Sequence, residues 1–161
     1  MMKYRVEKWD AVDLLVRARD FQAETSEKEI PAFWDEYYGN EVFRKVPGYL
    51  GVCTQKKTDG NTFRYGIGCK AADVVGVPEG FELIHIPENT WAVFTCVGPS
   101  PKAIQEMWKT IYREWLPVAE YELIPDYDIE NHLPGDSDSR NNVSEICIPV
   151  RKIPSDEQTR R

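Results

Sequence analysis

A chain of 161 residues is long enough for one domain that buries most of its apolar surface. Its formal net charge of −7 argues against direct contact with nucleic acid, because the phosphate backbone attracts clustered Lys and Arg. The amino terminus lacks the apolar region of a secretory signal, and no apolar stretch is long enough to cross a membrane. We therefore expect a cytoplasmic protein that contacts neither nucleic acid nor a membrane.

The first third of the chain predicts two extended segments followed by a helix. Residues 4–6 and 13–21 have the pattern of strands, and the polar run after them starts the helix. Thr25 or Ser26 can cap this helix, and the Gly39-Asn40 pair ends it.

Two strands joined by a short turn are expected next. They cover residues 49–55 and 62–70, and the turn at 58–61 has hairpin composition. Alternation along the second strand places Tyr65 on the same face as Phe63, Ile67 and Cys69.

The second half of the chain repeats this order after a connection at residues 71–89 that is rich in Pro and Gly. It predicts a strand at 90–97, a helix at 102–116, and strands at 121–133 and 144–152. Each half is thus a strand-helix-strand-strand unit, with pseudo-repeats at about 3–70 and 81–152 of a single domain 1–152 and a polar tail at 153–161. Such units predict an α+β fold in which both helices lie on one face of a mostly antiparallel sheet, with a central ligand groove.

The two predicted helices carry the same aromatic stripe. Ile30-x3-Trp34-x3-Tyr38 returns as Ile104-x3-Trp108-x3-Tyr112, 74 residues later, which indicates an internal duplication. Residues four apart share one helix face, so each stripe faces either the core or a groove between the helices. Trp and Tyr keep a polar tip that can serve a ligand, and both interpretations stay open here.

Cysteine and histidine give no metal or cofactor signature. The four cysteines are widely spaced in apolar runs, which favours buried, reduced thiols over disulfides: Cys53, Cys69, Cys96 and Cys147. His85 and His132 do not have metal-ligand spacing either. We expect neither a metal nor a cofactor.

Carboxylates inside apolar strands are the most unusual polar residues. Alternation places Asp128, Glu130 and His132 on one face of their strand, and Glu145 lies beside Cys147 in the last strand. An ionised Glu is rarely buried alone, so Glu130 and Glu145 must each pair with a cationic side chain, reach solvent, or receive a cationic ligand.

Residues 3–152 resemble the gyrase-inhibitor-like effector-binding domains of bacterial transcription activators. The segments that carry the resemblance are Ile30-Pro31-Ala32-Phe33-Trp34, Tyr65-Gly66-Ile67-Gly68, Ile86 to Phe94, Leu116-Pro117 through Tyr121-Glu122, and Tyr127-Asp128-Ile129-Glu130-Asn131-His132 followed by Glu145 to Val150. The chain departs from the family at His132, where relatives carry an aromatic residue. We expect a free-standing form without a DNA-binding segment before the domain, since the chain is similar to the effector-binding proteins encoded in mobile gene cassettes.

The resemblance implies a pocket that binds lipophilic, aromatic cations through a carboxylate at its floor, with Glu130 favoured over Glu145. Cation–π contacts with the pocket walls would add to the attraction between the carboxylate and the cation. The aromatic residues expected to form the walls are Trp34, Tyr38, Tyr65, Trp91, Trp108 and Tyr112. Trp9 and Trp115 are interpreted as structural.

Two other functions are compatible with the sequence. Some stand-alone relatives are hydrolases, and Glu130 or Glu145 could act as a general acid or base on a small electrophile. The domain could also bind a protein partner, such as a transcription regulator, and inhibit it. We favour a binding protein over an enzyme because no Ser-His-Asp or Cys-His set is legible.

Overall fold

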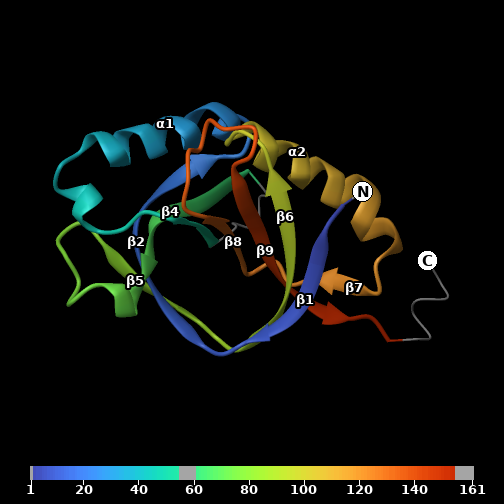
Figure 1. Ribbon diagram of the computed structural model, residues 1–161. Helices are drawn as coiled ribbons and strands as arrows, with labels where there is room; N and C mark the ends of the chain where they lie inside the picture. Colours follow the sequence, from blue (N-terminus) through green and yellow to red (C-terminus); the bar gives the residue numbers. More distant parts are fainter. Residues whose placement is uncertain (1, 55–60, 155–161) are drawn as a thin grey trace.

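The computed structural model describes residues 2–54 and 61–154. Two helices lie over one face of a nine-stranded sheet (Figure 1), and every strand pairing in this part of the chain is antiparallel. This confirms the expected α+β fold. Most of the turn expected at 58–61 and most of the tail at 153–161 lie outside the described residues.

The first half of the chain follows the expected order closely. Its elements are β1 (Tyr4–Trp9), β2 (Val12–Gln22), α1 (Ser26–Gly39), β3 (Leu50–Thr54) and β4 (Thr62–Lys70), with short 3-10 turns at Phe43–Lys45 and Ala71–Asp73. The helix ends where Gly39-Asn40 predicted, and β4 has the predicted bounds.

The second half differs from the prediction at three places. Its elements are β5 (Glu82–Ile86), β6 (Asn89–Val97), α2 (Lys102–Thr110), a wider π-helical turn (Ile111–Trp115), a 3-10 turn (Leu116–Val118), β7 (Tyr121–Leu123), β8 (Tyr127–His132) and β9 (Val143–Lys152). Strand β5 lies in the segment whose Pro-rich composition predicted a connection. It forms a strand there because it pairs with β2 along the backbone. The helix expected at 102–116 changes its winding after Thr110, and the segment expected at 121–133 divides into two strands.

Two local expectations were wrong. Thr25 occupies the N-cap position of α1, but no side chain caps this helix, because the hydroxyls of Thr25 and Ser26 donate instead to carbonyl groups of the preceding turn. Ile153, which the sequence placed in the polar tail, is buried, and its N–H donates to the Glu120 carbonyl at 2.8 Å.

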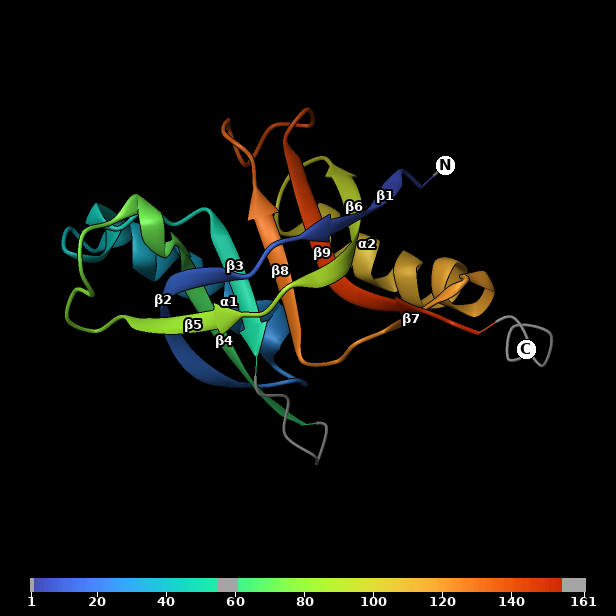
Figure 2. The same cartoon turned by 90° about the horizontal axis from the view of Figure 1, so that it is seen from below.

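The strand order shows how the two halves combine. The sheet runs β1-β6-β9-β8-β3-β4-β2-β5, with β7 added beside β9. Corresponding strands of the two halves therefore occupy mirrored places, and β8 and β3 meet at the centre (Figure 2). A residue on β8 or β3 thus lies where the two halves meet.

A long two-stranded ribbon, formed by β1 with β6 and by β2 with β5, connects the two halves. β1 and β2 pair with β6 and β5 in one unbroken register, from Tyr4 opposite Phe94 to Val16 opposite Glu82. β1 and β5 are the two edge strands of the sheet, and the ribbon continues from each of them into a strand near the opposite edge, β2 or β6. The sheet is therefore strongly bent (Figure 1).

Helix α1 is held to the sheet by different residues from those of its stripe. On α1, Phe33 and Tyr37 are buried against Phe21, Tyr65 and Ile67. Full burial of each such side chain contributes about 1.5–3 kcal/mol. The neighbouring stripe of α1 is thereby left beside the core rather than within it.

The α2 segment differs, because one residue of its stripe, Ile104, belongs to the core. Ile104, Ile111 and Trp115 are buried together with Phe94 and Ile146 of the sheet. The Trp115 ring meets Phe94 edge-on with 5.0 Å between ring centroids. Trp115 is therefore structural, as the sequence indicated.

Candidate ligand-binding site

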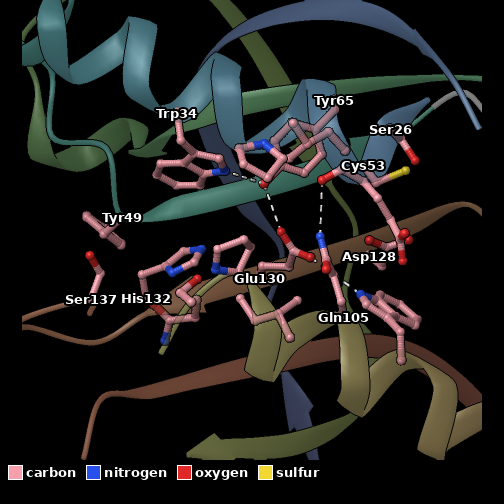
Figure 3. A pocket seen from close by; sticks show the side chains of 18 of the residues that line it. Ser26, Trp34, Tyr49, Cys53, Tyr65, Gln105, Asp128, Glu130, His132 and Ser137 are labelled. Atoms are coloured by element: carbon pink, nitrogen blue, oxygen red, sulfur yellow. Dashed lines mark hydrogen bonds between the residues drawn. The ribbon is translucent and has the colours of Figure 1, made fainter. Parts of the chain in front are cut away.

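A cavity of about 1440 Å³ lies between the two helices and the centre of the sheet. Helix α1 forms one wall, α2 forms the other, β4 and β8 contribute to the floor, and the loop between β8 and β9 contributes to the rim. Figure 3 shows the side chains that point into it. This is the position at which the sequence predicted a groove.

The repeated stripes supply both walls of the cavity: Ile30, Trp34 and Tyr38 from α1, and Ile104, Trp108 and Tyr112 from α2. Their aromatic pairs have the same geometry. Trp34 and Tyr38 are stacked with 6.1 Å between ring centroids and 21° between ring planes, and Trp108 and Tyr112 with 6.1 Å and 22°. Tyr38 and Tyr112 are 50% and 51% exposed, so each pair presents open ring surface to the cavity.

Glu130 lies at the floor between the two walls (Figure 3). The Tyr65 hydroxyl donates to its Oε1 at 2.8 Å, and Trp108 Nε1 donates to its Oε2 at 3.4 Å. Trp34 Nε1 donates in turn to the Tyr65 hydroxyl at 2.8 Å. Both tryptophans are thus connected to one carboxylate, Trp108 directly and Trp34 through Tyr65.

Burial makes this carboxylate reluctant to ionise. Burial is the main cause that raises the pKa of Glu130 to about 7; the hydrogen bonds from Tyr65 and Trp108 act in the opposite direction, and the nearby Asp128 adds to the rise. A carboxylate with neutral donors around it gains from a cation brought into the cavity, because the cation replaces the solvation that burial removed.

The cavity as a whole is acidic. Its described lining residues include five carboxylates and the single cationic side chain of Lys109: Glu27, Asp35, Asp128, Glu130 and Asp138. His132 does not add positive charge, because burial lowers its pKa to about 4 and keeps it neutral at physiological pH. This balance of charge favours cations over anions as ligands.

His132 extends the α1 wall toward the rim. Its ring meets Trp34 edge-on with 4.7 Å between centroids, and its Nε2 is buried without a hydrogen-bond partner among the described residues. The departure from the family's aromatic residue at this position therefore keeps a planar ring at the mouth of the cavity.

Trp91 was expected to be a wall residue, and this was wrong. It is fully buried in a core cluster with Leu14, Val16 and Val93, and stacks on Trp9 with 4.6 Å between centroids. It does not line the cavity. Alternation along β6 determines this, because Trp91 lies on the face opposite to that of Phe94, which packs under α2.

Glu145 was the second candidate for the floor, and the structure places it elsewhere. Cross-strand partners share a face, and β9 pairs Glu145 with Asn131 but Ile146 with Glu130. Glu145 therefore points away from the cavity, where it accepts hydrogen bonds from Arg5 at 2.9 Å and from Asn131 at 3.1 Å. Of the three interpretations considered for this residue, pairing with a cationic side chain is correct.

Gly51 is a site residue that the sequence analysis missed. It pairs with Glu130 across β3 and β8. A Cβ atom at this position would lie 2.0 Å from the Tyr65 hydroxyl and 3.0 Å from Glu130 Oε1. The absence of a side chain therefore makes room for the hydrogen bond between Tyr65 and Glu130 over the backbone of β3. Only the strand register reveals this role.

The remaining negative expectations concern metals, disulfides and membranes. Within residues 2–54 and 61–154, no three His, Cys, Asp or Glu side chains are grouped to hold a metal ion. All four cysteines are buried, and none is in a disulfide in the described part of the chain. None of the described helices has the length and apolar character to cross a membrane.

A large cavity with aromatic walls and one convergent carboxylate defines the class of a small-molecule-binding domain. The chain belongs to the family of integron-associated effector binding proteins, whose model matches residues 5–150. This confirms the resemblance to effector-binding domains and to proteins of mobile gene cassettes.

The chain is also similar to individual proteins in sequence and in fold. A putative transcriptional regulator protein, YobU of Bacillus subtilis strain 168, is 28% identical over 98 residues, which are 55% of this chain and 60% of YobU. The structure of SAV2435 bound to tetraphenylphosphonium superimposes with a TM-score of 0.78 at 21% identity, covering 93% of this chain and 94% of that one. The integron cassette protein VCH_CASS2 of Vibrio cholerae gives 0.69 at 15% identity, covering 92% and 95%. These two likenesses establish the shared fold.

Proposed function

We propose that this domain binds a lipophilic aromatic cation and neutralises its charge at Glu130. The observation that carries the proposal is the partly buried carboxylate of Glu130, whose hydrogen-bond partners among the described residues are the uncharged donors Tyr65 and Trp108. Removing one partner of a buried charge pair typically costs about 2–5 kcal/mol, so an ion that supplies the missing charge gains a comparable amount.

The walls provide the rest of the affinity. Each aromatic face that meets the ligand contributes about 0.5–2 kcal/mol through cation–π attraction, and apolar burial adds about 25 cal/mol per Å² before the costs of association. Two such faces and one neutralised charge contribute about 3–9 kcal/mol, and with apolar burial offsetting the costs of association they support micromolar affinity, about 8 kcal/mol. The similar structure that contains tetraphenylphosphonium, a lipophilic aromatic cation, supports this class of ligand.

The experiment is a fluorescence titration with matched cationic, neutral and anionic aromatic dyes, read through quenching of the five tryptophans. We expect saturable binding of cations alone. Glu130→Gln should weaken cation binding by about 30-fold or more. Glu145→Gln, which removes a carboxylate from the other face of the sheet, should leave binding unchanged. Equal binding regardless of charge, or an unaffected Glu130→Gln variant, would exclude the proposal.

A hydrolase is the alternative that the same residue allows. The pKa of Glu130 near 7 suits a general acid or base, whereas Glu145 points away from the cavity and cannot serve there. Turnover of a small electrophilic ester, present in the wild type and lost in Glu130→Gln, would favour the enzyme. Saturable binding without turnover favours the binding protein.

The biological setting follows from the same ligand-binding role. The similarity to YobU, a putative transcriptional regulator protein, supports a role of the bound ligand in regulation. A transcription-regulatory protein is accordingly the partner we propose. The free-standing form that the sequence indicated stays a prediction.

A further inference from the structure

The two walls of the cavity are equivalent in a way that the proposed function does not require. Trp34 with Tyr38 and Trp108 with Tyr112 have matching stacking distances, ring angles and exposure of the outer ring. Both pairs come from the internal repeat, whose halves meet at β3 and β8. A ligand with one aromatic ring could use only one of these pairs at a time.

The charge partner, by contrast, is single and central. Glu130 lies on β8 beside the junction of the two halves, and the residue that faces it on β3 is Gly51, which has no side chain. One oxygen of Glu130 is reached by Trp108 and the other, through Tyr65, by Trp34. The carboxylate therefore lies between the walls and is connected to both, directly to Trp108 and through Tyr65 to Trp34.

We propose that the pocket selects cations in which one central charged atom carries at least two aromatic arms, so that each Trp–Tyr pair receives one arm. This inference rests on the proposed binding of cations at Glu130 and specifies the shape of the ligand. The cavity of about 1440 Å³ exceeds the roughly 300–1000 Å³ of common ligand pockets, which agrees with two arms held on opposite walls.

The test compares two cations that differ by one arm. Benzyltrimethylammonium has one aromatic arm on its charged nitrogen, and dibenzyldimethylammonium has two. The readout is the ratio of their dissociation constants, measured by calorimetry on the full chain. We expect the two-armed cation to bind at least about 30-fold more tightly, because it adds a ring–ring contact and a cation-facing aromatic surface on the second wall.

Variants of each wall distinguish this specificity from general hydrophobic attraction. In Trp34→Leu and in Trp108→Leu alike, the ratio should fall below about 5, because the second arm loses its partner. The one-armed cation can move to the intact wall. Each tryptophan substitution also removes a hydrogen bond near Glu130, but this loss changes the affinity of both cations alike and cancels in the ratio of their dissociation constants. Tyr38→Leu and Tyr112→Leu provide a second pair of variants that leave the hydrogen bonds of Glu130 in place.

The control is Tyr4→Leu, which removes an aromatic ring that is 47% exposed and does not line the cavity. It should keep the ratio of the wild type. A wild-type ratio near 1, a ratio unchanged in both wall variants, or a ratio that falls in only one of them would overturn the two-armed selection. If neither cation binds the wild type, the proposed function itself fails, and this inference fails with it.

Discussion

Replacing Glu130 by Gln should stabilise the folded protein above neutral pH. Burial raises the pKa of Glu130 from the ordinary 4.5 to about 7 in the folded state, whereas the unfolded chain keeps the ordinary value. The folded state thus holds the proton more tightly, and the protein loses stability as the pH rises from about 4.5 through about 7. At 1.36 kcal/mol per pKa unit, the full shift corresponds to about 3 kcal/mol.

The assay is urea unfolding of the wild type and Glu130→Gln at pH 5 and pH 8.5. Because part of the loss has already occurred at pH 5, the free-energy difference in favour of the variant should grow by about 2 kcal/mol between these two values. Glu145→Gln serves as the matched control, since it removes the charge that pairs with Arg5 and one of the two acceptor oxygens, and should destabilise the protein at both pH values. A difference for Glu130→Gln that stays constant, or that shrinks as the pH rises, would refute the assignment of Glu130 as a carboxylate destabilised by burial.

Two further substitutions test the packing around the site. Gly51→Ala places a methyl group 2.0 Å from the Tyr65 hydroxyl, so we expect it to break the hydrogen bond to Glu130, to cost about 1–3 kcal/mol in urea unfolding, and to weaken cation binding. An unchanged unfolding midpoint would contradict this role of Gly51. Trp91→Ala should cost about 3–5 kcal/mol of unfolding free energy and leave the cation affinity of the folded protein within about twofold of the wild type. A large loss of affinity would return Trp91 to the binding site.

The elements with strong local signals were predicted well from the sequence. β4 and α1 end where their turn and cap residues indicated, because Gly39-Asn40 and the alternation of β4 act within a few residues of chain. β5 was missed because its flanking Pro and Gly residues resemble a loop, and only its pairing with β2 makes it a strand. Local composition cannot report a partner that lies about 70 residues away.

The candidate site likewise has a part that local spacing predicts and a part that depends on tertiary packing. The stripes of Trp34 and Trp108 could be found from spacing alone, since helix periodicity fixes which side chains share a face. Whether such a stripe enters the core or a cavity depends on what packs against it. On α1, Phe33 and Tyr37 fill the core and leave Trp34 at its edge.

The sequence by itself determined the duplication, the faces of each helix and strand, and the presence of two carboxylates in apolar strands. The tertiary structure alone decided which carboxylate is the floor of the cavity, because strand register places Glu130 beside Ile146 and turns Glu145 toward Arg5. It also shows the role of Gly51, because only the folded structure places the Tyr65 hydroxyl in the space that a side chain at position 51 would occupy. Periodicity is a property of a few consecutive residues, whereas a binding site depends on contacts between strands and helices far apart in the chain.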